Sequence, residues 1–385
     1  MSKGPSRGRI LLWTISILLF LGVYHLVSDD TTYSQSPSEP DPASSASQPA
    51  AAEEPEPAQQ ETAAQRPQYD DDWACAPALG DASHLDEMQV EHVLLISVDG
   101  LIPGAIEMLG EADAPAFHRL INGGSSTFNA RTAPTITLTT PNHTSMITSR
   151  LIRDDGCGHW VDFNSDQEDV TIHSHRGVYI PSVFDVAHDN GFSTAMLAGK
   201  SKFSLYNRSY DETHGWNHDT GAQGGDRKID FYFNGTDTEI STQLSSLLSV
   251  EEPAPFLFIH FAGPDRTGHS DGFEVSGSSP YLDSVRMVDQ RLSQILSLVE
   301  QNPSLNGTTT LIVTSDHGGV DTHHNDNERP ENYTIPFIVW GPGVEAGADL
   351  YLLNNDRRTD PGTSKGDISL GQGNRPIYNG EAGNL

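Results

Sequence analysis

HVLLISVDG (residues 92–100) is a short apolar run that ends in an Asp-Gly pair, and its length suits a buried strand. Three later runs have the same character: FLFIHFAGPD (256–265), TTLIVTSDHGG (309–319) and IPFIVWG (335–341). Helical patterns alternate with these runs, at 115–122, 182–190, 237–249 and 280–301. This alternation predicts an α/β fold in which helices cover both faces of a mostly parallel sheet. Ligands of such sheets gather at the carboxyl ends of the strands.

Acidic residues stand where three of the four predicted strands should stop. Two of these acids bring a histidine with them, either four residues later, on one face of a helical turn, or directly adjacent. The candidate ligands are Asp99, Asp265, His269, Asp316, His317 and either His323 or His324. One such Asp alone is more often a helix cap or a turn residue. Three at equivalent places predict a metal site, and mixed carboxylate and imidazole ligands favour zinc, with manganese or iron as alternatives.

A threonine-rich stretch, TAPTITLTTPNHTSMITS (132–149), supplies a candidate nucleophile. Pro141 suits the first turn of a helix, which places Thr139 and Thr140 at a helix amino terminus, where anionic oxygens are stabilised. A threonine hydroxyl needs a base or a metal ion to become a nucleophile. Alone, the stretch would indicate a helix cap; beside a metal site, either threonine could attack a substrate.

The ordered motifs SVDG, TTPNH, PDRTGH and SDHGG, with a histidine before IPFIVWGPGV, resemble one family over about residues 90–385. This is the nucleotide pyrophosphatase/phosphodiesterase branch of the alkaline phosphatase superfamily. The resemblance implies an alkaline-phosphatase-like fold. It also implies a nucleophilic threonine two residues before the proline of T-x-P-N, which selects Thr139 over Thr140.

The same resemblance implies two divalent metal ions, expected to be zinc. One ion would take Asp99, Thr139, Asp316 and His317, and the other would take Asp265, His269 and His324. His324 is preferred to His323 because the family has this histidine about eight residues after the aspartate of DHGG. The family also has an asparagine that holds a phosphate oxygen, and Asn164 corresponds to it, although Trp160 stands where the family has glycine.

The substrate prediction depends on a lysine pair. Lys200 and Lys202, in MLAGKSKF (196–203), stand where phosphomonoesterases of the superfamily carry cations. From the resemblance we expect a phosphodiesterase or nucleotide pyrophosphatase acting on small phosphate esters, with Lys200 at the substrate, while the lysine pair keeps monoester hydrolysis open. The alternatives are a phosphomonoesterase and a surface-tethered binding domain without turnover. A sulfatase is disfavoured because the C-x-P-x-R nucleophile motif is absent from the sequence.

The amino-terminal region predicts a membrane anchor. Lys3, Arg7 and Arg9 precede an uncharged, largely apolar run at 10–27. This order predicts a single-pass signal-anchor with residues 1–9 in the cytoplasm and the catalytic domain outside; a cleaved signal, giving a secreted or periplasmic protein, is the alternative. Residues 28–88, rich in Pro, Ser, Ala and acids, predict a disordered linker before a domain at 89–385.

Composition excludes one class of partner. The chain has 53 acidic and 22 basic residues and a net charge of −31, so nucleic acid binding is not expected. Its two cysteines, Cys75 and Cys157, could form one disulfide or remain apart. The sequence ends at YNGEAGNL (378–385), where known relatives continue into an apolar helix, so we expect a domain shortened at this end.

Overall fold

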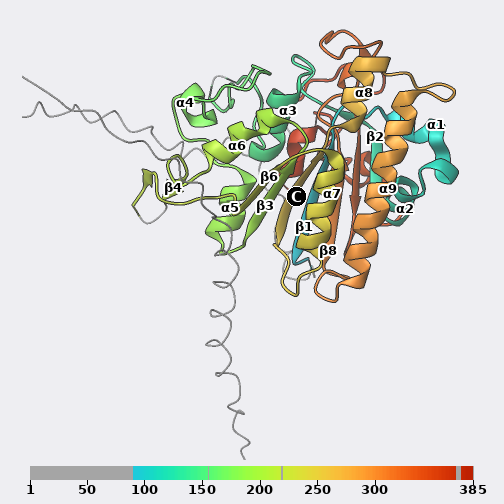
Figure 1. The fold of residues 1–385 in the computed structure, drawn as a ribbon. Coiled ribbons are helices and arrows are strands. Elements are labelled where there is room, and N and C mark those ends of the chain that lie inside the picture. The colour runs from blue at the N-terminus through green and yellow to red at the C-terminus, as the bar shows by residue number, and fades with distance from the viewer. Residues whose placement is uncertain (1–89, 155, 218–219, 370–373, 385) are drawn as a thin grey trace, which may run out of the picture. The chain divides into compact units, whose positions relative to one another are not determined.

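The computed structural model describes residues 90–154, 156–217, 220–369 and 374–384, which are built around one large sheet (Figure 1). The sheet has eight strands in the order β10-β2-β9-β8-β1-β7-β3-β6. Their bounds are β1 His92–Val98, β2 Ser125–Arg131, β3 Thr194–Ala198, β6 Phe231–Asn234, β7 Phe256–Phe261, β8 Thr309–Thr314, β9 Thr334–Trp340 and β10 Ala348–Asp349. Strand β9 runs antiparallel to both of its neighbours and the other pairings are parallel. A separate hairpin pairs β4 (Trp216–Asn217) with β5 (Ala222–Gln223).

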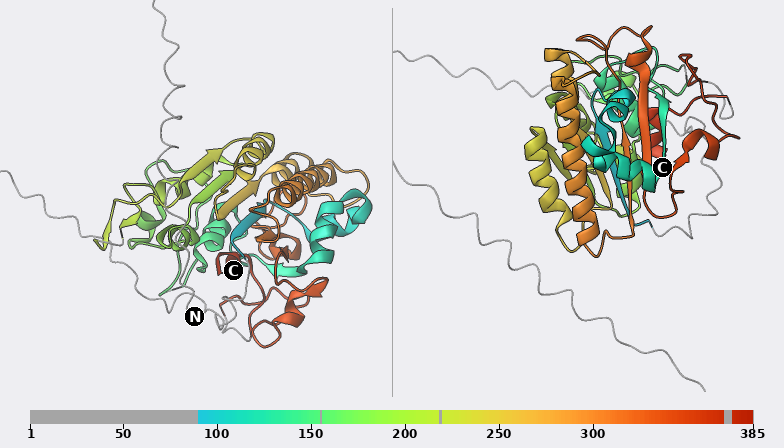
Figure 2. Two further views of the ribbon diagram at one scale, coloured as in Figure 1. Left: turned by 90° about the horizontal axis from the view of Figure 1, so that it is seen from below. Right: turned by 90° about the vertical axis from the view of Figure 1, so that its right-hand side faces the viewer.

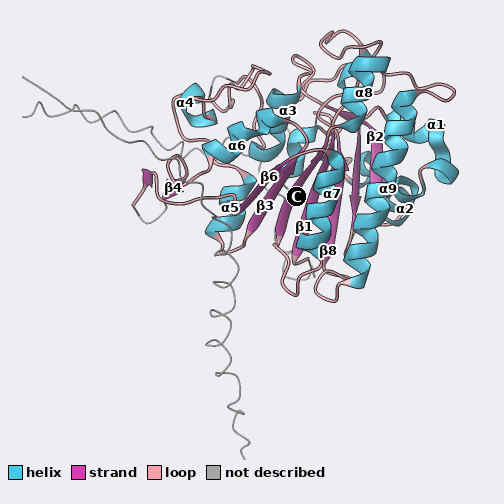
Figure 3. Ribbon diagram, viewed as in Figure 1, coloured by secondary structure: helices cyan, strands magenta, loops and turns pink. Residues whose placement is uncertain are grey.

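Helices occupy most connections between the strands (Figure 3). The helices that precede β3 in the chain are α1 Pro103–Asp113, α2 Pro115–Gly123, α3 Thr139–Thr148, α4 Ile172–Arg176 and α5 Val183–Asp189. Later come η3 Ser201–Phe203, α6 Ser204–Ser209, α7 Asp237–Leu248, α8 Gly263–Asp271, α9 Pro280–Gln301, α10 Pro330–Tyr333, α11 Leu350–Leu353 and η4 Asn379–Asn384.

Two apolar cores lie on opposite faces of the sheet, as the side-chain alternation of a strand requires. From β1, Leu94 and Ile96 join the core beneath α1, α2, α7 and α9, whereas Leu95 joins the core beneath α3 to α6. The layers are seen edge-on in Figure 2, where α7 and α9 stand on one side of the sheet. Each fully buried leucine contributes about 1.5–3 kcal/mol. These cores hold the strand ends in place and so fix the site described below.

The predicted fold class is confirmed: the sheet is mostly parallel and has helices on both faces. The 280–301 prediction matches α9 residue for residue, but the 335–341 run forms the antiparallel strand β9, an orientation that a single apolar run does not encode. Within the described residues, no helix is both long and apolar enough to traverse a bilayer. The predicted anchor at 10–27, the linker at 28–88 and a Cys75–Cys157 pairing depend on residues outside that set.

Candidate metal centre and active site

Strand β1 delivers the first candidate ligand. Asp99 follows the last residue of the strand and its side chain is fully buried. Gly100 then turns the chain with a φ of 71°, and a Cβ there would lie 3.0 Å from the Phe273 ring and 3.1 Å from Asp265. Because both the backbone angle and the space exclude other residues, the Asp-Gly pair lets the end of β1 approach the first turn of α8 closely.

The first ligand cluster comprises Asp99, Asp316 and His317. Asp316 and His317 follow β8, which pairs directly with β1, so the two strand ends meet. His317 Nε2 lies 3.2 Å from Asp316 Oδ2 and 3.4 Å from Asp99 Oδ1. All three side chains are fully buried. The structure thus brings Asp99 together with a pair of residues more than 200 positions later in the sequence.

The second ligand cluster comprises Asp265, His269 and His324. Asp265 is in the first turn of α8 rather than at the end of β7, and His269 is one turn further along the same helix. His269 Nε2 lies 3.4 Å from Asp265 Oδ1 and 3.1 Å from His324 Nε2. His324 is buried and points into the cluster, whereas its neighbour His323 is exposed. His317 stacks on His324 at 3.6 Å between ring centroids and so lies between the two clusters.

Three histidines of the clusters share one hydrogen-bonding arrangement. The Nδ1 atoms of His269, His317 and His324 lie 2.9, 2.8 and 2.6 Å from the backbone oxygens of Thr322, Gly318 and Thr137. A carbonyl oxygen only accepts, so each Nδ1 carries the proton and each Nε2 presents its lone pair to the cluster. Metal-binding histidines are oriented in this way.

Within the described part of the chain, several buried polar atoms of the two clusters have no hydrogen-bond partner, as the ligand atoms of a cation would. The described side chains leave four buried atoms of the clusters without a hydrogen-bond partner: Asp99 Oδ1, Asp265 Oδ1, Asp316 Oδ2 and His317 Nε2. Unpaired buried polar atoms are costly. Their convergence, together with the Nε2 lone pairs, fits a pair of divalent ions with mixed oxygen and nitrogen ligands.

The pKa shifts of the buried carboxylates indicate that the site has more negative than positive charge. Burial and the neighbouring Asp99 raise the pKa of Asp316 well above its usual value. Burial would also raise the pKa of Asp99, but Lys200 and His260 outweigh it and hold that pKa well below normal. Lys200 Nζ lies 2.6 Å from Asp99 Oδ2 and 2.6 Å from Asp265 Oδ2, so this ammonium group connects the two clusters.

The candidate nucleophile lies beside this ammonium group. Thr139 is the first residue of α3, its side chain is buried, and its Oγ1 lies 3.3 Å from Lys200 Nζ. Asn142, in the same first turn, accepts a hydrogen bond from the Ala133 amide and donates to the carbonyls of Ile136 and Leu138. The loop entering the helix is therefore fixed, and Thr139 is held at the site.

Asn164 and Lys202 lie at the same helix end. Asn164 Oδ1 accepts hydrogen bonds from the Thr140 amide at 3.0 Å, the Thr140 hydroxyl at 3.2 Å and Lys202 Nζ at 3.1 Å. Its amide hydrogens are the part left to donate to a substrate. Trp160 has a φ of 61°, in the region that glycine favours, which accounts for the glycine that the resemblance places there.

Three contributors were not singled out from the sequence: His143, His260 and Asn379. His143 Nδ1 donates to the Thr139 carbonyl at 2.8 Å, while its Nε2 accepts from Ser97 Oγ at 2.8 Å. Asn379 Nδ2 lies 3.4 Å from the Asp316 carbonyl oxygen, so η4 supports both α3 and β8. For His260, a signal existed: it is the polar residue within the apolar run FLFIHF.

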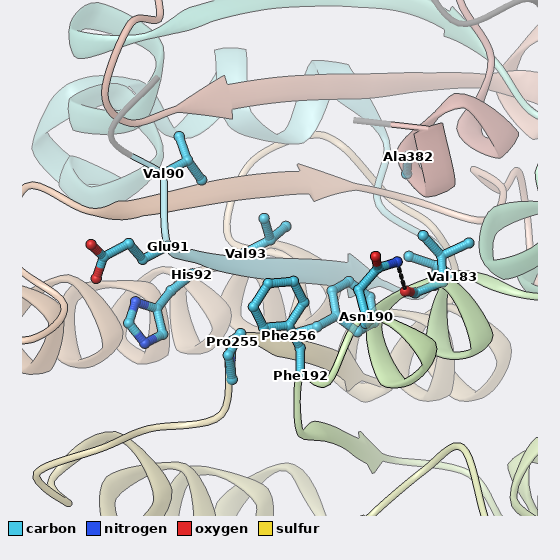
Figure 4. A pocket seen from close by; sticks show the side chains of 12 residues that line it. Val90, Glu91, His92, Val93, Val183, Asn190, Phe192, Pro255, Phe256 and Ala382 are labelled. Carbon is cyan, nitrogen blue, oxygen red and sulfur yellow. Dashed lines mark hydrogen bonds between the residues drawn. The ribbon is translucent and has the colours of Figure 1, made fainter. Parts of the chain in front are cut away.

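A separate pocket of about 620 Å³ opens where β1 and β7 begin (Figure 4). Its lining is mostly apolar and includes Val93, Val183, Phe192 and Phe256. The ligand clusters follow the opposite ends of the same strands, about 20 Å away at 3.3 Å per residue. This pocket is therefore not part of the candidate active site.

Comparison with known proteins gives a family. Residues 93–345, more than half of the chain, match the model of the type I phosphodiesterase/nucleotide pyrophosphatase family. The chain belongs to this family. The matched region includes Thr139, Asn164, Lys200 and both ligand clusters. The resemblance predicted from the ordered motifs is thereby confirmed, and with it a family of enzymes that act on phosphate esters.

Several curated relatives align with parts of the chain. GPI ethanolamine phosphate transferase 1 of Mus musculus is 31% identical over 101 residues, which are 26% of this chain and 10% of the relative. The Homo sapiens protein of the same name is 27% identical over 155 residues, 38% of this chain and 16% of the relative. The alignments thus span only a small fraction of the relatives' length.

Solved structures with a similar arrangement include two kinds of enzyme. Murine ectonucleotide pyrophosphatase/phosphodiesterase 5 has a TM-score of 0.47 and 16% identity, covering 67% of this chain and 90% of that chain. A 2-O GAG sulfatase has a TM-score of 0.48 and 13% identity, covering 68% of each chain. Both scores are below 0.5, so the family assignment rests on the sequence match.

Proposed function

We propose that this protein is a metal-dependent hydrolase of phosphate diesters or pyrophosphates that uses Thr139 as its nucleophile. The observation that carries the proposal is the convergence of the His317 and His324 Nε2 lone pairs and unpaired carboxylate oxygens in one buried space, with the exposed His269 at its edge. The Thr139 hydroxyl lies beside that space, tied to both clusters through Lys200.

The ligand assignment follows the two clusters. We propose that one ion is held by Asp99, Thr139, Asp316 and His317, and the other by Asp265, His269 and His324. The donor set favours zinc. When bound, the two ions would favour the deprotonated form of the attacking hydroxyl and offset negative charge on the phosphate.

The remaining chemistry belongs to the chain's own residues. Thr139 Oγ loses its proton and attacks phosphorus, the bond to the leaving alcohol or nucleotide breaks as the leaving oxygen takes up a proton, and a phosphate ester of Thr139 forms. The Asn164 amide donates to a phosphate oxygen, and the positive end of the α3 dipole stabilises the phosphate charge. A water molecule then attacks phosphorus and its proton is released. The Thr139–phosphorus bond breaks, and Thr139 recovers its hydroxyl proton. Lys200, within 3.3 Å of Thr139 Oγ1, stabilises this oxygen whenever it carries negative charge.

Two related activities, phosphomonoester hydrolysis and phosphate transfer to an alcohol, are each favoured by one observation. Lys200 and Lys202 bring two ammonium groups to the helix end that would hold the phosphate, which favours a monoester with its extra charge. The curated relatives are named as phosphate transferases, in which an alcohol would replace water in the second step. The Thr139 ester is common to all three reactions.

Hydrolysis assays distinguish these activities. The full chain, loaded with zinc, should release nitrophenol faster from bis(nitrophenyl) phosphate than from nitrophenyl phosphate, and added alcohols should divert product only if it is a transferase. Thr139→Ala should lower turnover by at least about 10³-fold, as loss of a nucleophile does. Thr148→Ala is the matched control, because it removes a hydroxyl from the last turn of the same helix. No turnover by the loaded protein, or equal rates for Thr139→Ala and the unmodified chain, would contradict the proposal.

The predicted location completes the proposal. We propose that the run at 10–27 anchors the chain and holds the catalytic domain on the outer side of the membrane. Protease added to intact cells should remove the domain, and protection of the domain would contradict this orientation.

A further inference from the structure

His260 is a buried histidine that contacts a candidate ligand without belonging to either cluster. It is the fifth residue of β7, pairs in register with Ser97 of β1, and is fully buried. Its Nε2 lies 2.9 Å from Asp99 Oδ2. The ring of Phe203 packs against it at 4.3 Å between centroids, which fixes the plane of the imidazole.

The hydrogen bonds of His260 define its tautomer. The Gly199 amide donates to His260 Nδ1 at 3.0 Å, so Nδ1 is an acceptor and carries no proton. The ring proton is therefore on Nε2, from which it is donated to Asp99.

This contact makes the two oxygens of Asp99 unequal. Oδ2 accepts from His260 and from Lys200, at 2.9 and 2.6 Å. Oδ1 has no hydrogen-bond partner among the described side chains and lies 3.4 Å from His317 Nε2. We propose that His260 is a positioning residue for a divalent cation: it holds Asp99 so that Oδ1 alone is directed at the ion.

The inference rests on the proposed metal site and extends it to the loop that carries Lys200. Gly199, which donates to His260, and Phe203, which packs on it, flank Lys200 in the sequence. His260 therefore joins the ligand Asp99 to the substrate-side loop in one rigid unit. Such partners of metal ligands typically change metal affinity 10–100-fold when they are replaced.

Two substitutions test the hydrogen bonds of the two ring nitrogens of His260 one at a time. In His260→Asn the side-chain oxygen can still accept from the Gly199 amide, but position 260 no longer donates to Asp99. In His260→Gln the amide nitrogen can reach Asp99, but the acceptor for Gly199 is lost. We expect His260→Asn to weaken Zn²⁺ binding by about 10–100-fold, and His260→Gln to weaken it by less than about threefold.

His173 supplies a matched control. It is also fully buried, accepts at Nδ1 from the Ile180 amide at 3.1 Å, and donates from Nε2 to the Ser209 carbonyl at 2.7 Å. His173→Asn removes the same donor but contacts neither cluster, so we expect it to leave Zn²⁺ affinity unchanged.

The measurement is metal binding by the metal-free full chain. Zn²⁺ is titrated against a chromogenic chelator, Co²⁺ gives a visible spectrum that reports ligand geometry, and thermal unfolding of the metal-free variants reports any loss of fold. A weaker Zn²⁺ affinity and an altered Co²⁺ spectrum for His260→Asn alone support the inference. Equal affinities for His260→Asn, His260→Gln and the unmodified chain overturn it, as does equal weakening by His173→Asn. If the unmodified chain binds neither ion, the proposed function itself fails.

Discussion

Asp237 offers a quantitative test of how the fold holds the second ligand cluster. It is the first residue of α7, yet its carboxylate accepts from the Ala262 and Gly263 amides, both at 3.0 Å. These amides open α8, the helix that carries Asp265 and His269. In Asp237→Ala both amides lose their partner in a largely buried position.

The expected loss follows from the two bonds. A hydrogen bond to a charged group contributes about 1.5–3 kcal/mol, so we expect Asp237→Ala to lower the free energy of unfolding by about 3 kcal/mol. Urea unfolding should be followed with a chelator present, because bound metal would add its own stabilisation.

An exposed acid in the first turn of another helix provides the control. Asp283 of α9 forms an exposed ion pair with Arg286, and Asp283→Ala should cost less than about 1 kcal/mol. If Asp237→Ala also costs less than about 1 kcal/mol, the reasoning that Asp237 holds the start of α8 is refuted.

Three further substitutions test other parts of the account. Gly100→Ala adds a clash to a left-handed φ and should cost about 3 kcal/mol or more in unfolding measurements, whereas Gly177→Ala, with φ 84° and open space, should cost about 1 kcal/mol; equal costs would contradict the close approach at Gly100. His324→Ala should lose zinc in elemental analysis while His323→Ala retains it, and the reverse result would reassign the ligand. Burial lowers the pKa of His173 to about 3, below roughly 6.5 in the unfolded chain, so the unfolded chain binds the proton first. His173 should therefore contribute to a loss of stability of the metal-free protein as pH drops from about 6.5 toward 3, with about 2 kcal/mol of its own at pH 5. His173→Gln should remove this share while the other buried histidines keep theirs, and an unchanged pH profile would contradict it.

The sequence predicted the features that depend on local pattern. Apolar periodicity located α9, and acids after apolar runs located Asp99 and Asp316. Both signals are local because burial on one face imposes a repeat on neighbouring residues. The four-residue spacing also placed Asp265 and His269 on one helix, although Asp265 lies within α8 rather than at the strand end.

Contacts between distant segments could not be predicted in the same way. His260 contacts Asp99 because β7 pairs with β1, and Asp237 reaches the start of α8 because β6 and β7, which precede α7 and α8, lie on either side of β3. Neither residue belongs to a motif, and their roles depend on pairing that no single run encodes. The antiparallel direction of β9 is of the same kind, since it is set by the connection between β8 and β9.

The central claim, that Thr139 becomes covalently phosphorylated in a metal site, has one most direct test. The zinc-loaded full chain is mixed with bis(nitrophenyl) phosphate, quenched in acid during steady turnover, digested, and mapped by mass spectrometry. The account predicts a nitrophenyl phosphate group esterified to Thr139 that is absent when a chelator is present. Turnover with the ester on Thr140, or with no modified threonine in α3, would contradict it.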